Sequence, residues 1–136
     1  MKHIMKKKVD YMDNIIPGPR TFVFDVDGTI SSIKTVDETY SDVKPFQEMI
    51  DSINHLYDRG DRIILFTARG MRTYNNDLEL INRHVKPVLE EWLNRNNVQY
   101  HELIMGKPWG PNVTYVDDRG FQAEAFLEAF YIHEDI

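Results

Sequence analysis

Short apolar runs alternate along the chain with longer stretches in which apolar residues recur every three or four positions. The short runs are rich in aromatic and β-branched residues and lack a strict alternation of apolar and polar positions, which is typical of buried strands. They predict four strands, at residues 21–24, 62–66, 103–105 and 113–116.

The longer stretches predict helices. From Phe46 to Tyr57 the apolar residues follow the spacing of an amphipathic helix, with Pro45 suited to its first turn and Gly60 to its end. The same spacing recurs over residues 78–92, where Pro87 either kinks the helix or starts a new one. A closing helix is expected over residues 121–131. Strands that alternate with helices predict an α/β fold with a central parallel sheet.

Length and composition limit the classes of protein that fit. With 136 residues, we expect a basic N-terminal extension over 1–19, which holds four of the lysines, and a single domain over 20–136. The chain has no cysteine, which excludes disulfides and Cys-ligated zinc. A net charge of −6 argues against a nucleic-acid partner. Without a run of membrane-spanning length or a signal-peptide pattern, we expect a cytoplasmic protein with no membrane partner.

Polar residues that could bind a ligand or take part in catalysis follow each of the four predicted strands. In a parallel sheet the carboxyl ends of the strands share one edge, and ligands bind there. Taken singly, each of these residues has a structural explanation as a turn or a helix cap. Their joint occurrence at successive strand ends favours a functional site, made of Asp25 and Asp27 after the first strand, Thr67 after the second, Lys107 after the third, and Asp117 and Asp118 after the fourth.

Two carboxylates with a single residue between them, at the end of an apolar strand, need a counterion. Side chains at i and i+2 lie on one side of an extended chain, so Asp25 and Asp27 are expected to face the same ligand. Carboxylates gathered in this way bind protons unless a cation joins them, and hard oxygen ligands favour Mg²⁺. Gly28 allows the backbone to turn sharply directly after them.

These residues resemble a known family. DVDGT at 25–29, Thr67 after a strand, Lys107, and the pair Asp117-Asp118 resemble the four motifs of the haloacid dehalogenase superfamily of phosphatases, over about residues 20–130. The stretches FTARG and KPWGPNVTYVDDRG further resemble short phosphatases associated with bacterial capsule polysaccharide synthesis. The resemblance implies a Rossmann-like, three-layer αβα sandwich.

The resemblance also implies catalytic roles. Asp25 would attack phosphorus to form an aspartyl-phosphate, and Asp27 would first protonate the leaving oxygen and then take a proton from water. Thr67 would bind the transferred phosphoryl oxygens, and Lys107 would balance the charge of the phosphate and of Asp25.

A cation site follows from the same resemblance. Mg²⁺ would be held by an oxygen of Asp25, the backbone carbonyl of Asp27, and Asp118 as the third protein ligand. Asp117 would then orient Lys107 or a water, and the roles of Asp117 and Asp118 could be reversed.

No cap domain is expected, because residues 30–44 are too few for one and residues 70–106 are used by helices and a strand. The site would be open or covered by a neighbouring subunit of a homo-oligomer. Arg69 is the preferred substrate contact, and Gly28, Thr67 and Lys107 complete the expected substrate-binding set. Further rim candidates are Arg72, Tyr74, Trp109 and Arg119.

The leading expectation is a Mg²⁺-dependent phosphomonoesterase that acts on a small sugar or polyol phosphate. One alternative is a polynucleotide 3′-phosphatase. The negative net charge and the lack of a basic groove lined by aromatic residues argue against it. The other is a phospho-accepting module of the response-regulator type, which is not an enzyme. In that fold the acceptor Asp ends a middle strand, whereas here the DxD pair ends the first readable one.

Overall fold

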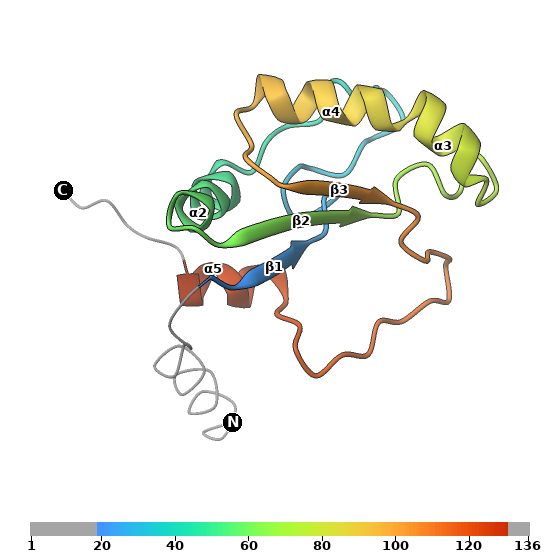
Figure 1. Ribbon diagram of the computed structural model, residues 1–136. Helices are drawn as coiled ribbons and strands as arrows, with labels where there is room; N and C mark the ends of the chain where they lie inside the picture. Colours follow the sequence, from blue (N-terminus) through green and yellow to red (C-terminus); the bar gives the residue numbers. More distant parts are fainter. Residues whose placement is uncertain (1–18, 131–136) are drawn as a thin grey trace.

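A computed structural model describes residues 19–130 of the chain. Three strands form one parallel sheet in the order β1-β2-β3: β1 (Thr21–Phe24), β2 (Arg62–Thr67) and β3 (Glu102–Met105). Four helices follow or separate them: α2 (Gln47–Asp58), α3 (Leu78–His84), α4 (Lys86–Arg95) and α5 (Ala123–Phe130). All three strands point the same way, so their carboxyl ends share one edge (Figure 1). The protein is therefore an α/β protein with a central parallel sheet.

The helices begin and end where the local sequence chemistry favours it. The apolar stripe of α2 is buried, including Ile50 and Ile53. The side chain of Asp77 caps α3 by accepting hydrogen bonds from the backbone N–H groups of Glu79 and Leu80. Pro87 lies in the first turn of α4, where its missing N–H costs no hydrogen bond. Of the two expectations for Pro87, the new helix is confirmed.

One face of the sheet carries the core. Phe22 and Phe24 of β1 point to the same side, and both rings lie edge-on to Phe126 of α5, at centroid distances of 6.2 and 5.1 Å. The register places Phe24 beside Leu65, and Leu65 beside Leu103, so the buried side chains of all three strands form one layer. This packing holds the three parallel strands in place, so that their carboxyl ends lie at one edge of the sheet.

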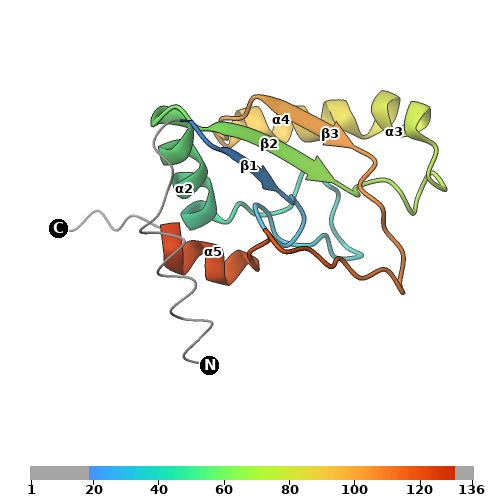
Figure 2. The same ribbon diagram turned by 60° about the horizontal axis from the view of Figure 1, so that its bottom comes forward.

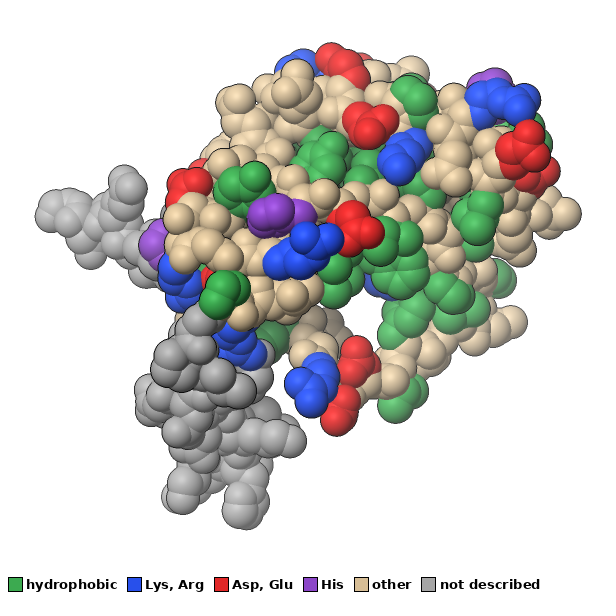
Figure 3. All heavy atoms as spheres, viewed as in Figure 1, with side chains coloured by type: hydrophobic (Ala, Val, Ile, Leu, Met, Phe, Trp, Pro, Cys, Tyr) green, Lys and Arg blue, Asp and Glu red, His purple; other side chains and the backbone are tan. Residues whose placement is uncertain are grey.

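The opposite face of the sheet is open within residues 19–130. Val23 and Ile104, in the outer two strands, are exposed, and no helix of the described chain lies in front of the strands when the sheet is viewed from this side (Figures 1 and 2). Apolar side chains are visible across this face (Figure 3). The three-layer sandwich is thus not completed by the described residues. The sequence could not signal this, because the strands are apolar on both faces.

The fourth predicted strand does not form. Residues 113–116 have no strand partner, and Val116 is 94% exposed. The chain from β3 to α5 instead runs outward as a long connection and returns to the far side of β1 (Figure 2). β-branched composition predicted a strand there, but a strand needs an edge to pair with, and this segment lies away from the free edge of β1.

The expected N-terminal extension, except for residue 19, lies outside the described residues. The closing helix α5 ends at Phe130, and the last residue of the expected range lies outside them as well. Among residues 19–130, none of the helices combines the length and the apolar character needed to cross a bilayer.

Candidate functional site at the carboxyl edge of the sheet

A tight turn after β1 presents Asp25 and Asp27. Val26 between them is fully buried, and its carbonyl accepts hydrogen bonds from the backbone N–H groups of Thr29, Ile30 and Ser31. Gly28 has φ +80°, a left-handed conformation that favours glycine, and its N–H donates to the Ser31 carbonyl at 2.8 Å. The buried valine anchors the turn, and the two carboxylates on either side remain partly exposed.

Asp25 faces Lys107. The Lys107 Nζ lies 3.7 Å from Asp25 Oδ1, and the lysine is placed there because its backbone N–H donates to the Thr67 carbonyl at 3.0 Å, directly beyond the β2–β3 pairing. Burial raises the pKa of Asp25, and the Lys107 ammonium and the Val26 N–H oppose that rise, while the Asp27 charge adds to it. The positive charge around the Asp25 carboxylate is therefore too small to offset the effect of burial on its pKa.

Thr67 lies at the floor of the site, at the end of β2. It is fully buried, and its Oγ1 accepts a hydrogen bond from the backbone N–H of Arg69 at 3.1 Å. The turn that follows contains Gly70 at φ +86°, where any side chain would collide with Val85. This turn directs the Arg69 side chain back toward the β1 turn.

Arg69 grips Asp27. Its Nη2 donates to Asp27 Oδ1 at 2.8 Å and its Nε donates to Oδ2 at 3.3 Å. The Arg69 side chain is 0% exposed and that of Asp27 is 27% exposed. Arg69 was expected to contact the substrate from the rim. In this structure it lies inside the protein, paired with Asp27 and covered by the Tyr40 ring.

Tyr40 also belongs to this site, although no motif in the sequence indicates it. The Arg69 guanidinium lies over its ring, 4.4 Å from the centroid. Burial raises the pKa of the Tyr40 phenol, and the Asp27 charge adds to the rise. The only signal in the sequence is a lone aromatic in the polar stretch 31–44, which is weak evidence by itself.

The loop that carries Tyr40 is fixed to α4. The indole Nε1 of buried Trp92 donates to the Val43 carbonyl at 2.9 Å, and Arg95 Nη2 donates to the Ser41 carbonyl at 2.7 Å. These two bonds fix the chain directly after Tyr40 and so help to hold its ring against Arg69.

The structure does not bring Asp117 and Asp118 to the site. Both lie on the exposed connection after β3, where the Asp117 carboxylate accepts from the Arg119 backbone N–H at 2.9 Å. Within residues 19–130, no three or more Asp, Glu or His side chains gather in a way that could hold a metal ion. The expected cation site, made of an Asp25 oxygen, the Asp27 backbone carbonyl and Asp118, is thus not assembled in this conformation, because the strand that was expected to deliver Asp118 does not form.

The remaining oxygen donors still suit Mg²⁺. This ion commonly takes only one or two carboxylates and completes its octahedron with waters and a substrate phosphate. The Asp25 carboxylate, with a pKa raised by burial and by the neighbouring Asp27 charge, is a donor that a cation would stabilise.

The other candidate rim residues are spread around this edge. Arg72 and Trp109 are exposed, whereas Tyr74 stacks on His84 with ring centroids 5.8 Å apart. Lys107 lies over the Tyr115 ring, 4.4 Å from its centroid, and the Tyr115 hydroxyl donates to the Pro108 carbonyl. The backbone of residues 107–115 is thereby folded back beside the lysine.

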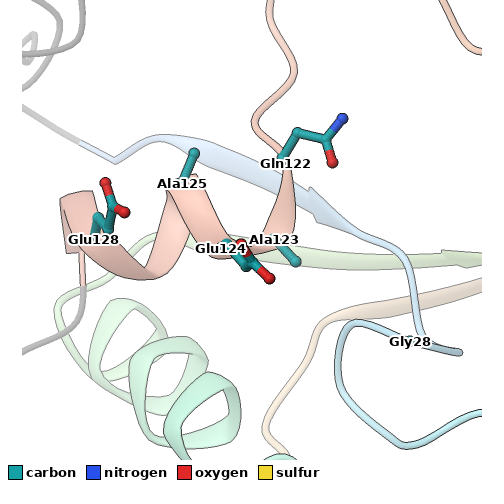
Figure 4. Close-up of a pocket in the computed structure, with 6 residues that line it drawn as sticks. All are labelled: Gly28, Gln122, Ala123, Glu124, Ala125 and Glu128. Atoms are coloured by element: carbon teal, nitrogen blue, oxygen red, sulfur yellow. The ribbon is translucent and has the colours of Figure 1, made fainter. Parts of the chain in front are cut away.

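A pocket of about 490 Å³ lies between the β1 turn and α5 (Figure 4). Gly28 borders it on one side, and Gln122, Ala123, Glu124, Ala125 and Glu128 border it on the other. Two glutamates on its wall disfavour a phosphate there.

Comparison with known proteins agrees with this fold. No family model matches the chain, and no curated protein matches it. A Vibrio cholerae protein, whose crystal structure was determined as an MCSG target, is 36% identical, with a TM-score of 0.74 over 79% of this chain and 87% of that chain. The chain belongs to the same family as this Vibrio cholerae protein. The family membership supports the α/β fold and assigns no activity.

Proposed function

We propose that the protein is a Mg²⁺-dependent phosphomonoesterase of the haloacid dehalogenase type, without a cap domain. The observation that carries the proposal is the juxtaposition of Asp25 and Lys107, 3.7 Å apart, beside Asp27 at the carboxyl edge of a parallel sheet. A partly exposed carboxylate beside an ammonium suits attack on a phosphate dianion, because the cation offsets the repulsion between the two anions.

The proposed reaction has two steps. In the first, an oxygen–phosphorus bond forms at Asp25, the ester oxygen–phosphorus bond breaks, and Asp27 gives its proton to the leaving oxygen. In the second, water attacks phosphorus, Asp27 takes the water's proton, and the Asp25–phosphorus bond breaks to release inorganic phosphate. Thr67 lines the floor and Lys107 balances the phosphoryl charge throughout.

Asp25 and the Asp27 backbone carbonyl would hold Mg²⁺. When bound, the ion neutralises charge on the phosphoryl oxygens. Asp117 and Asp118 remain candidates for a third ligand if the connection after β3 moves toward the site.

A small sugar or polyol phosphate remains the proposed substrate class. Residues 19–130 devote no segment to a cap, and of their basic side chains Lys107 lies beside Asp25 while Arg69 is buried. A role in capsule polysaccharide synthesis is part of the proposal and depends on the resemblance of FTARG and KPWGPNVTYVDDRG.

The test is turnover of p-nitrophenyl phosphate and a panel of sugar, polyol and nucleotide phosphates by the full chain, with Mg²⁺ and with EDTA. We expect Mg²⁺-dependent hydrolysis that Asp25→Asn reduces to background. If Asp118 completes the cation site, Asp118→Asn will raise the Mg²⁺ concentration for half-maximal activity, and the exposed carboxylate change Asp51→Asn will not.

Two outcomes would favour the alternatives. A stable aspartyl-phosphate with negligible turnover would indicate a phospho-accepting module. Faster turnover of DNA 3′-phosphates than of sugar phosphates would indicate a polynucleotide phosphatase.

A further inference from the structure

Arg69 is buried more completely than a substrate-binding arginine should be. Its side chain is 0% exposed, and the Tyr40 ring lies against its guanidinium at 4.4 Å. Arginines that bind phosphate present their fork of N–H donors to solvent before the ligand arrives. Here the fork is directed at Asp27, so any effect of Arg69 on a ligand passes through that carboxylate.

Stability alone does not account for this ion pair. A buried ion pair is often no more stable than an apolar pair of the same shape, since desolvation offsets the attraction. Arg69 also keeps a buried Nη1 that has no hydrogen-bond partner within residues 19–130. An arrangement that leaves a buried donor unused, yet directs two other donors at one carboxylate, favours a role in orienting that carboxylate.

The two hydrogen bonds of the fork differ. The bond from Nη2 to Asp27 Oδ1 is 2.8 Å long, and the bond from Nε to Oδ2 is 3.3 Å long. A hydrogen bond of 3.3 Å is weak for a charged pair. Oδ2 can therefore exchange its hydrogen-bond partner at a smaller cost in free energy than Oδ1, which stays fixed by Arg69 Nη2.

We propose that Arg69, covered by Tyr40, is a positioning residue that fixes Asp27 Oδ1 and leaves Oδ2 to face the oxygen of the leaving alcohol. This inference deepens the proposed function and rests on it. Before the first step, Oδ2 takes a proton from solvent in place of its weak bond from Arg69 Nε, and this proton passes to the leaving oxygen as the ester bond to phosphorus breaks. In the second, the same oxygen takes the proton of the attacking water. Arg69 itself touches neither substrate nor phosphate.

The leaving group distinguishes this role from substrate binding. An alkoxide needs a proton to leave, whereas p-nitrophenolate is a stable anion and does not. We expect Arg69→Met to lower the first-turnover rate for glycerol 3-phosphate by about 10²-fold, the usual contribution of general acid catalysis. Release of p-nitrophenolate in the first turnover should fall less than about threefold, and KM for both substrates should stay within about twofold.

Two further variants sharpen the test. Asp27→Asn should show the same dependence on the leaving group, and adding Arg69→Met to it should cause no further loss, because both changes remove one function. The matched control is Arg59→Met, which breaks another Arg–Asp pair within residues 19–130, with bonds of 2.9 and 2.6 Å to Asp61, away from the site. It should leave the ratio of the two first-turnover rates unchanged.

Equal losses with both leaving groups, or a large rise in KM for both, would overturn the proposal and make Arg69 a substrate contact. A readout without activity separates it from the proposed function. The Arg69 Nε–H should give a solvent-protected NMR signal in the wild type that is lost in Asp27→Asn. If that signal behaves as expected but the wild type hydrolyses no ester, the proposed function fails and the ion pair stands. If the signal is exchangeable in the wild type, the positioning role fails even in an active phosphatase.

Discussion

The two ends of β2 each carry an arginine–aspartate fork, and the two forks are built in opposite ways. At the amino end, the Asp61 side chain is 3% exposed and Arg59, which grips it, is 42% exposed. Asp61 also accepts from the Arg20 backbone N–H at 2.9 Å, which joins the starts of β1 and β2. At the carboxyl end the burial is reversed, with Arg69 inside and Asp27 facing out.

This reversal shows which partner of each pair is available for other interactions. A buried carboxylate with its acceptors filled fastens two strands and has no capacity left for a ligand. A buried guanidinium does the opposite, because it fixes one oxygen of the carboxylate and presents the other toward solvent. The same two residue types thus join two strands at one end of the sheet and hold a carboxylate toward solvent at the other.

The largest effect on stability is expected from Asp27→Ala, although its carboxylate is the more exposed of the two. Removing it leaves a fully buried guanidinium without its counterion, which typically costs about 3 kcal/mol or more in free energy of unfolding. Asp61→Ala should cost about 2 kcal/mol, because the half-exposed Arg59 returns to water and mainly the hydrogen bonds of Asp61 are lost. Urea denaturation of both variants measures the difference.

A compensating change checks the cause. Adding Arg69→Met to Asp27→Ala should restore a substantial part of the lost stability, since no buried charge then remains. If Asp61→Ala proves more destabilising than Asp27→Ala, the Arg69 guanidinium is not as buried as described, and the contrast between the two ends fails.

Three of the four strands that the sequence predicted are confirmed, together with the helices that connect them, because each has a local periodicity that tertiary packing reinforces. Residues 62–66 are one example, where an apolar run became the middle strand of the sheet. The segment 113–116 is also rich in β-branched and aromatic residues but found no partner edge, so its strand propensity was not realised. Local propensity indicates what a segment can form, and the contacts decide whether it does.

The site shows the same limit at the level of single side chains. Spacing along the strands predicted that Asp25, Thr67 and Lys107 share an edge, because parallel strands end together. It could not predict that Arg69 would turn inward or that Tyr40 would cover it. Those contacts depend on the path of the loop 31–44, which is fixed by hydrogen bonds from α4 rather than by its own sequence pattern.

A smaller effect, and one that depends on pH, is expected from Asp25→Asn without metal. The pKa of Asp25 is raised in the folded state by burial, so between the ordinary value of 3.8 and the raised value the folded chain binds more protons than the unfolded chain. Stability therefore falls as pH rises through that window and stays lower above it. Asp25→Asn removes this loss. Because the carboxyl is 37% exposed, screening keeps the gain small, at about 2 °C in Tm at pH 7.

Calorimetry in EDTA at several pH values provides the measurement. The gain from Asp25→Asn should shrink as pH falls and disappear below the ordinary carboxyl pKa, where both states are protonated. A loss of Tm at pH 7 would mean that attraction to Lys107 outweighs burial, and that the carboxyl end is as well neutralised as the amino end.

The smallest effect decides whether the connection after β3 belongs to the carboxyl end at all. Val116 is 94% exposed, so Val116→Asp should change the free energy of unfolding by less than about 0.5 kcal/mol. The same substitution at buried Val98, away from the site, should cost about 3 kcal/mol or more, because it buries an unpaired carboxylate. A comparable cost at Val116 would mean that residues 113–116 pack against the sheet in solution. Asp117 and Asp118 would then lie beside Asp25, and the carboxyl end would hold a complete cation site rather than a single carboxylate awaiting its ligand.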